Sequence, residues 1–177
     1  MQMDHLKYPI GKHEVLQTFD QASIDESIET LQKAPVLLKE AIQGLKKEQL
    51  LTPYREGGWT VWQVVNHLPD SHMNAYVRFK LALTEENPVI RPYAEHLWAE
   101  LPDSHDTQPE VSIQLLSALH ERWVILLKGL EEKDYYKTYY HPEDKEKVAV
   151  YQAIGMYSWH SRHHIAHITS LRERMGW

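Results

Sequence analysis

The chain has 177 residues, of which 42% are hydrophobic and 25% charged, a composition typical of a single globular domain. Its 19 Lys and Arg residues stand against 25 Asp and Glu, and the net charge of −6 argues against a general nucleic-acid-binding protein, whose phosphate contacts need clustered basic residues. The absence of cysteine excludes a disulfide framework, a thiolate metal site and a cysteine nucleophile.

We expect one domain over residues 1–177, located in the cytoplasm and without a membrane partner. No stretch approaches the roughly 20 apolar residues of a membrane span, and the first residues lack a basic region followed by an apolar run. Residues 1–20 show no sustained period and contain Pro9 and Gly11, so they are predicted to form an extended arm packed on the surface.

The first long helix is predicted to begin at Ser23, because Ser23 and Glu26 have the spacing of a capping box. Apolar residues at helical spacing follow, at positions 24, 28, 31, 38, 42 and 45. Pro35 lies inside this periodic run and predicts a kink or a break, since proline removes a backbone donor.

A second helix has a well-marked start, in which Thr60 and Gln63 fit a capping box and Trp59 could pack on Val64. Its apolar stripe continues to about residue 86, with a bend expected at Pro69. Residues 87–106 make a long connection that is predicted to contain a short helix over residues 93–101.

A third helix is predicted to begin at residues 107–110 and to continue to residue 130, with leucines and Trp123 on its apolar face. Residues 135–150 are predicted to form a small hairpin or an irregular excursion. The last helix should extend from about residue 151 to residue 174, with Gly176 in the position that a helix C-cap prefers. The fold class is therefore all-α, an antiparallel four-helix bundle, whose core is a usual place for a metal site.

The last helix carries two histidine pairs with a spacing of four residues, His160/His164 and His163/His167. His164 lies near the middle of the apolar face and His160 toward its edge, so this pair is predicted to point inward. His163 and His167 are predicted to face solvent or to contact a partner chain.

A third ligand has to come from another helix, because two imidazoles make a weak and unselective site. On a straight-helix projection His72 lies at the centre of the apolar stripe of the second helix and His67 on its flank. Pro69 lies between them, so the projection leaves the choice open. The other histidines are read as ordinary surface or packing residues: His5, His13, His96, His105, His120 and His141.

Beyond these patterns, the chain resembles DinB/YfiT-type proteins, and within them the YfiT group of metal-dependent hydrolases. The resemblance extends from Tyr8 over nearly the whole chain, and it is carried by residues 52–61, 65–74, 90–93 and 159–168. It implies a four-helix bundle of DinB type in which three histidines bind one divalent metal ion, zinc or nickel. Carried over by position, the ligands are His67, His160 and His164, and dimers are common among similar proteins.

Three neutral imidazoles leave a coordination position open for water, which favours a hydrolase acting on a small molecule. The alternative is a bacillithiol S-transferase acting on small electrophiles, in which the metal holds a thiolate, as the resemblance implies. A second alternative is a non-catalytic, stress-associated metal-binding module, whose site is structural.

No general base is evident in the sequence, because the His-Glu-x-x-His motif is absent and residues 161–163 are Ser, Arg and His. Peptide hydrolysis is therefore disfavoured. Asp70 is one turn from His67 and is a candidate to orient it. Tyr76, Arg78 and Trp98 are candidates to line a pocket for an anionic or apolar substrate.

Overall fold

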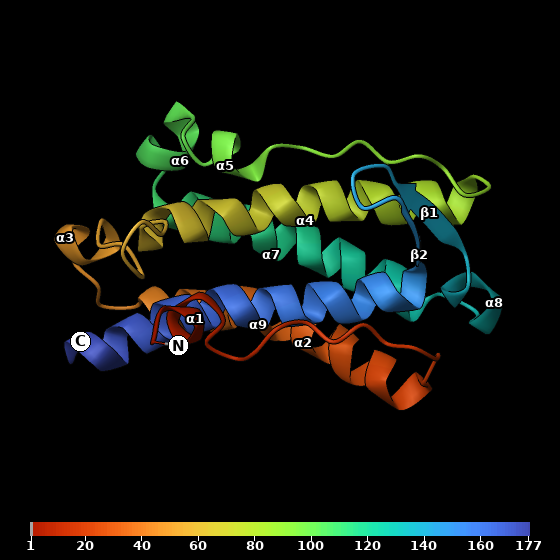
Figure 1. The fold of residues 1–177 in the computed structure, drawn as a ribbon, viewed down its shortest axis with the longest axis horizontal. Coiled ribbons are helices and arrows are strands. Elements are labelled where there is room, and N and C mark those ends of the chain that lie inside the picture. Colours follow the sequence, from red (N-terminus) through yellow and green to blue (C-terminus); the bar gives the residue numbers. More distant parts are fainter. Residues whose placement is uncertain (1) are drawn as a thin grey trace.

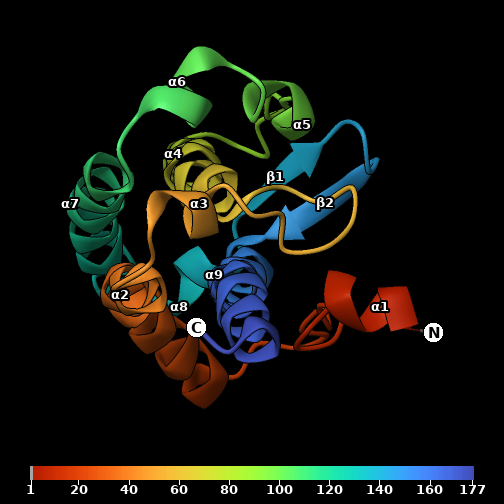
Figure 2. The same cartoon turned by 90° about the vertical axis from the view of Figure 1, so that its left-hand side faces the viewer.

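The computed structural model describes residues 2–177, and its centre is a bundle of four long helices (Figure 1). Seen from one end, the helices follow one another around the core in the order α4, α7, α2, α9 (Figure 2). The all-α four-helix bundle expected from the sequence is confirmed. The four helices are α2 (Gln21–Ile42), α4 (Val61–Thr84), α7 (Pro109–Lys128) and α9 (Val150–Met175).

The directions of the helices follow from the long connection between α4 and α7. This connection runs back along the bundle, so that α7 has the same direction as α4, while α2 and α9 run the opposite way (Figure 1). It contains two short helices, α5 (Glu95–Trp98) and α6 (Pro102–Asp106), in place of the single short helix predicted. The connection is tied to α4 because the Asn66 amide donates to the Ser104 carbonyl at 2.9 Å.

The N-terminal arm differs in part from the predicted extended conformation. Residues Gln2–Lys7 form a short helix, α1, whereas residues 8–20 contain no helix or strand. This second part lies along α9, where the Trp159 indole donates to the Gly11 carbonyl at 3.2 Å and the Gln152 amide donates to the Leu16 carbonyl at 3.2 Å. The arm therefore covers the outer side of α9.

Helix α2 begins two residues earlier than the sequence indicates. Asp20 is its N-cap, and the Asp20 carboxylate accepts from the backbone N–H of Ser23 at 2.9 Å. The predicted start at Ser23 is wrong because aspartate three residues earlier is an equally good capping residue. Neither Pro35 in α2 nor Pro69 in α4 ends its helix, so no break occurs at either position.

The start of α4 is confirmed as predicted. Thr60 is the N-cap, its hydroxyl accepts from the Gln63 backbone N–H at 3.1 Å, and the Gln63 side chain accepts from the Thr60 backbone N–H at 3.0 Å. The Gln63 amide also donates to the Ala99 carbonyl at 3.0 Å. One residue thus fixes the first turn of α4 and holds the α5 segment against it.

We expect Thr60→Ala to lower the free energy of unfolding by about 1 kcal/mol, because the orphan N–H of the first turn loses its acceptor. Urea unfolding followed by circular dichroism measures this change. Thr169→Ala, at an exposed position inside α9, is the control and should change stability by less than about 0.5 kcal/mol. An equal loss in both variants would contradict a specific role for the cap.

The predicted hairpin before the last helix is present. Strands β1 (Thr138–His141) and β2 (Glu146–Ala149) pair antiparallel, with Thr138 opposite Ala149 and His141 opposite Glu146. Helix α9 follows β2 directly and ends at Met175, and Gly176 is its C-cap, with a φ of 68° in the left-handed conformation that glycine adopts without strain. The remaining short helices are α3 (Lys47–Leu50) and α8 (Glu132–Tyr135).

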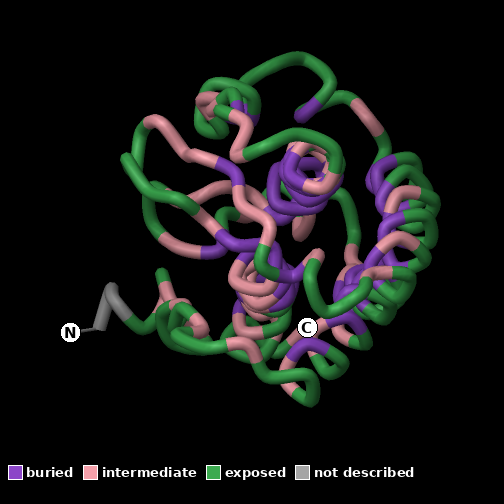
Figure 3. Tube along the Cα trace, turned by 90° about the vertical axis from the view of Figure 1, so that its right-hand side faces the viewer, coloured by how far each residue is buried: buried purple, intermediate pink, exposed green. Residues whose placement is uncertain are grey.

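The buried side chains form two apolar clusters along the bundle, and the inward faces of the long helices are buried (Figure 3). On α9 the first cluster ends at Tyr157 and the second begins at Ile168, so His160 and His164 fall between them. Polar histidine side chains therefore interrupt the apolar core at this level. Within residues 2–177, no helix has the length and apolar composition needed to cross a membrane.

Candidate metal centre

Three histidines meet in the gap between the two apolar clusters. His67 comes from α4, and His160 and His164 come from successive turns of α9. One ring nitrogen from each residue lies within 4.8 Å of the other two, and His67 Nε2 is 3.4 Å from His160 Nε2. Four-residue spacing places two imidazoles on one face of α9, and the antiparallel packing of α4 brings the third opposite them.

The geometry fits a divalent metal ion. Two nitrogens bound tetrahedrally to zinc at about 2.0–2.1 Å would lie about 3.3 Å apart, close to the separation of the His67 and His160 nitrogens. His164 Nδ1 is buried and has no hydrogen-bond partner among the described residues. Imidazole ligands suit zinc, copper, iron or nickel better than magnesium or calcium. The three residues could therefore hold such an ion.

Burial keeps the three imidazoles neutral. Desolvation, and then the charge of His167, lower the pKa of His67 to about 3. Burial followed by repulsion from neighbouring histidines lowers the pKa values of His160 and His164 well below the ordinary value. Metal binding requires the neutral ring with a free lone pair, so near pH 7 these side chains are in the binding state.

The three histidines of the cluster differ in exposure. His67 and His164 are buried, whereas His160 is partly exposed. The Trp59 indole lies 4.7 Å from the His67 ring and 6.3 Å from the His164 ring, measured between centroids. Sequence reasoning assigned Trp59 only to the start of α4, and the structure makes it a wall of the site.

His67 and His72 meet different nitrogens of His160. His67 approaches His160 Nε2, whereas His72 Nε2 lies 3.1 Å from His160 Nδ1. Helix α4 is continuous through Pro69, so residues 67 and 72 project about 140° apart, and His160 sits at the level between them. Both histidines touch the same ring, but only His67 joins the three-residue cluster.

His163 and His167 are buried, so the prediction that they face solvent is wrong, whereas contact with a partner chain stays a prediction. The His163 ring stacks on Trp159 with centroids 4.4 Å apart, and the His167 ring stacks on Tyr54 at 3.9 Å. His167 Nε2 is 3.1 Å from the carbonyl of Lys7. The N-terminal arm and the loop before α4 bury the side of α9 that the helix alone would expose.

His120, read from the sequence as an ordinary residue, is buried in the core of the bundle. Its Nε2 lies 2.7 Å from His72 Nδ1, and its Nδ1 lies 2.6 Å from the carbonyl of Leu31. The available sequence signal was its place on the apolar face of α7, three residues before Trp123 and four before Val124. A single histidine at such a position gave no indication of its partners.

Asp70 and Trp98 lie on the side of α4 covered by the long connection. Asp70 makes no hydrogen bond to His67 among residues 2–177, so the structure gives no support for Asp70 as the residue that orients that ring. Burial, with the charge of Asp103 second, raises the pKa of Asp70 to about 6. Trp98 is exposed and packs on Tyr93, with ring centroids 4.6 Å apart.

Tyr76 and Arg78 lie further along α4 than the three-histidine cluster. The Tyr76 ring is 6.5 Å from Trp123 and has the cations of Lys80 and Arg122 over its faces, which places it toward α7. Arg78 is buried, and its guanidinium lies 3.4 Å from the Tyr157 hydroxyl. Its Nε has no partner, and no carboxylate pairs with it within the described chain.

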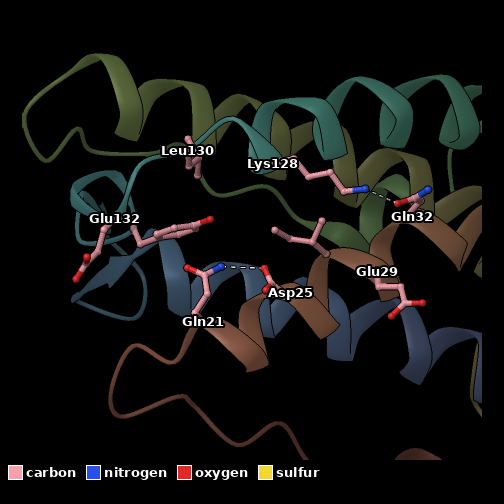
Figure 4. Close-up of a pocket in the computed structure, with 9 residues that line it drawn as sticks. Gln21, Asp25, Glu29, Gln32, Lys128, Leu130 and Glu132 are labelled. Atoms are coloured by element: carbon pink, nitrogen blue, oxygen red, sulfur yellow. Dashed lines mark hydrogen bonds between the residues drawn. The ribbon is translucent and has the colours of Figure 1, made fainter.

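A surface pocket of about 390 Å³ between α2, the end of α7 and α8 lies apart from this site (Figure 4). No histidine lines it. Its polar side chains pair with one another, as the Gln21 amide donates to Asp25 at 2.8 Å and Lys128 donates to Gln32 at 2.8 Å. These contacts join lining residues to one another, and the three-histidine cluster takes no part in the pocket.

Fold and site together define a helical-bundle protein with a candidate metal centre made of imidazoles alone. The family model of the DinB superfamily matches residues 30–168, and the chain belongs to this superfamily. It is 50% identical over 173 residues to the Bacillus subtilis (strain 168) protein named "Putative metal-dependent hydrolase YfiT", covering 98% of this chain and 97% of that one.

A second relative and a solved structure are similar to the chain over nearly its whole length. A Bacillus cereus (strain ATCC 10987) protein named "Putative metal-dependent hydrolase" is 54% identical over 176 residues, covering 99% of this chain and 100% of the relative. The solved structure of Bacillus subtilis YfiT superposes with a TM-score of 0.96 at 50% identity, covering 98% of this chain and 99% of that one. It is described as "a probable metal-dependent hydrolase with an unusual four-helix bundle topology".

Proposed function

We propose that this protein is a metal-dependent hydrolase in which His67, His160 and His164 hold one divalent ion, zinc or nickel. The observation that carries the proposal is the convergence of three ring nitrogens within 4.8 Å, without a competing carboxylate or a closing fourth side chain in the cluster. When bound by three imidazoles, such an ion keeps a position open for water and lowers the pKa of that water to around 7.

The protein itself supplies neutral ligands, an aromatic wall and one ligand that is partly exposed. Burial of His67 and His164 removes competing water, and Trp59 covers both rings. The partly exposed His160 marks the side from which a small substrate would approach. No glutamate occupies the position of the metalloprotease base between His160 and His164, so we propose small esters or amides, and not peptides, as the substrate class.

The environment of Arg78 favours a substrate that carries an anionic group. It is a buried guanidinium without a carboxylate partner, and a buried charge is costly unless it is paired. The Arg78 guanidinium donates to the Arg91 carbonyl and to the Tyr157 hydroxyl, each at 3.4 Å, and Tyr157 packs against His160 with ring centroids 5.9 Å apart. One side chain, Tyr157, therefore separates the Arg78 charge from the proposed ligand His160. An anionic substrate would supply the missing partner.

The test is hydrolysis of activated esters and amides by the zinc- and nickel-loaded protein, measured with and without bacillithiol. We expect cleavage without thiol, loss of at least 100-fold in kcat/KM for His160→Ala, and full activity for His96→Ala, at an exposed position in α5. Metal removal by a chelator should abolish turnover while circular dichroism shows the bundle intact.

The other readings give distinct results. A rate that depends on bacillithiol and disappears in His160→Ala selects thiol transfer, in which the open position holds the thiolate. Unfolding on chelation, with no turnover of any probe, selects a structural metal module. Either result would overturn the hydrolase proposal.

A further inference from the structure

Two buried histidines that the metal cluster does not use form a continuous chain with it. His72 of α4 and His120 of α7 are 0% and 2% exposed. The contacts run from the Leu31 carbonyl to His120 Nδ1 at 2.6 Å, from His120 Nε2 to His72 Nδ1 at 2.7 Å, and from His72 Nε2 to His160 Nδ1 at 3.1 Å. The chain therefore links the backbone of α2 to a proposed metal ligand on α9.

The direction of each hydrogen bond in this series of histidines follows from the first one, in which His120 contacts the Leu31 carbonyl. A carbonyl oxygen only accepts, so His120 Nδ1 must carry a proton and donate it to Leu31. In a neutral imidazole the second nitrogen is then bare, so His120 Nε2 accepts and His72 Nδ1 must donate. The same rule leaves His72 Nε2 bare, and His160 Nδ1 donates to it.

The last step leaves His160 Nε2 without a proton, and this is the nitrogen that faces the metal cluster. His160 Nε2 is the atom 3.4 Å from His67 Nε2. A metal ion binds only a bare ring nitrogen, so the opposite tautomer of His160 could not serve as a ligand through this atom. The series of hydrogen bonds thus selects the tautomer of His160 that the metal site needs.

The rings of His72 and His120 have the orientation that such a bond requires. Their planes differ by 5°, and their centroids are 4.9 Å apart, close to the 2.7 Å contact between the nitrogens plus the two ring radii, so the N–H of one ring points along its plane at the lone pair of the other. Trp123 packs edge-on against both rings, at 5.7 Å from His72 and 5.8 Å from His120. Its indole restricts the rotation of both imidazoles.

We propose that His72 and His120 are positioning residues that, through hydrogen bonds ending at the Leu31 carbonyl, hold His160 in the tautomer with a bare Nε2 directed at the metal. This inference rests on the proposed metal site and adds to it a support that crosses all four long helices, from α9 through α4 and α7 to α2. Outer partners of metal-bound histidine typically contribute 10- to 100-fold in metal affinity.

The direct test is long-range ¹H–¹⁵N NMR of the metal-free, histidine-labelled protein, which identifies the protonated nitrogen of each ring. We expect His120, His72 and His160 each to carry the proton on Nδ1. In His120→Phe, which keeps a planar ring but removes both nitrogens, His160 should become a mixture of tautomers although residue 120 does not touch it. His120→Gln, whose amide can both donate to Leu31 and accept from His72, should restore the Nδ1–H form.

Zinc affinity, measured by competition with a chelating dye, gives the second readout. His72→Phe should weaken zinc binding by 10- to 100-fold, and His120→Phe by less, since it acts through His72. Trp123→Phe is the matched control, because it disturbs the packing of both rings and leaves every hydrogen bond of the chain in place. It should leave the His160 tautomer unchanged.

The outcomes separate this inference from the proposed function. A wild-type His160 that carries its proton on Nε2 would contradict the proposed series of hydrogen bonds, even if zinc binds tightly. A wild-type protein that has the expected tautomers but does not bind zinc would contradict the metal site and support the series of hydrogen bonds. If His120→Phe does not fold, the wild-type spectrum and the zinc affinity of His120→Gln, expected within threefold of wild type, decide the question.

Discussion

His164→Ala is expected to weaken zinc binding by more than about 100-fold, beyond the range produced by loss of an outer partner. The substitution leaves two imidazoles, His67 and His160, and the buried wall beside Trp59 then faces a cavity. Titration of zinc into the metal-free protein against a competing chelator measures the loss. The same variant should show no hydrolysis of the ester and amide probes.

His163→Ala is the matched control for this experiment. His163 is the neighbouring residue on α9, is also buried, and stacks on Trp159 at the outer side of the helix. We expect it to retain zinc affinity within threefold of wild type, and circular dichroism to show both variants folded. Loss of zinc binding in His163→Ala with retention in His164→Ala would assign the site to the outer pair.

Acid is expected to destabilise the metal-free protein strongly, because its buried histidines resist protonation. Burial lowers the pKa values of His120 and His167 to about 4, from an ordinary value of 6.5. Below pH 6.5 the unfolded chain takes up these protons while the folded chain does not, so stability falls as the pH falls, and the loss is complete near pH 4. The difference of 2.5 pKa units corresponds to about 3 kcal/mol for each residue.

Urea unfolding at pH 7.5, 6, 5 and 4.5 measures this dependence. His167→Gln should lower the slope of stability against pH by about 1.4 kcal/mol per unit within the window, since one proton fewer is taken up on unfolding. Gln114→Ala, at an exposed position without a titrating group on α7, should keep the wild-type slope. A His167→Gln slope equal to that of wild type would show that His167 is protonated in the folded protein as readily as in the unfolded chain.

The sequence by itself determined the four long helices and the inward pair of metal candidates. Local signals decided these features: the Thr60 and Gln63 capping box, the left-handed Gly176, and the helical period that puts His160 and His164 on the apolar face of α9. Each depends on residues within one or two turns of the chain, where periodicity and capping chemistry are read directly.

The assignment of His67 as the third member of the cluster depended on the family resemblance and on tertiary structure. Residues 61–69 of α4 are all buried, because the α5 and α6 segments cover the face that would otherwise meet solvent. A projection that assumes one apolar and one exposed face carries no information there. The structure shows that both His67 and His72 contact His160, and it separates them by which nitrogen each one meets.

The surroundings of the outer histidines were also decided by chain segments distant in sequence. Helical period placed His163 and His167 outside, and Tyr54, Lys7 and the rest of the N-terminal arm then covered them. His120 looked ordinary because its partners, Leu31 and His72, lie 89 and 48 residues away. A single helix defines which side chains share a face, and only the packing of segments distant in sequence decides what that face meets.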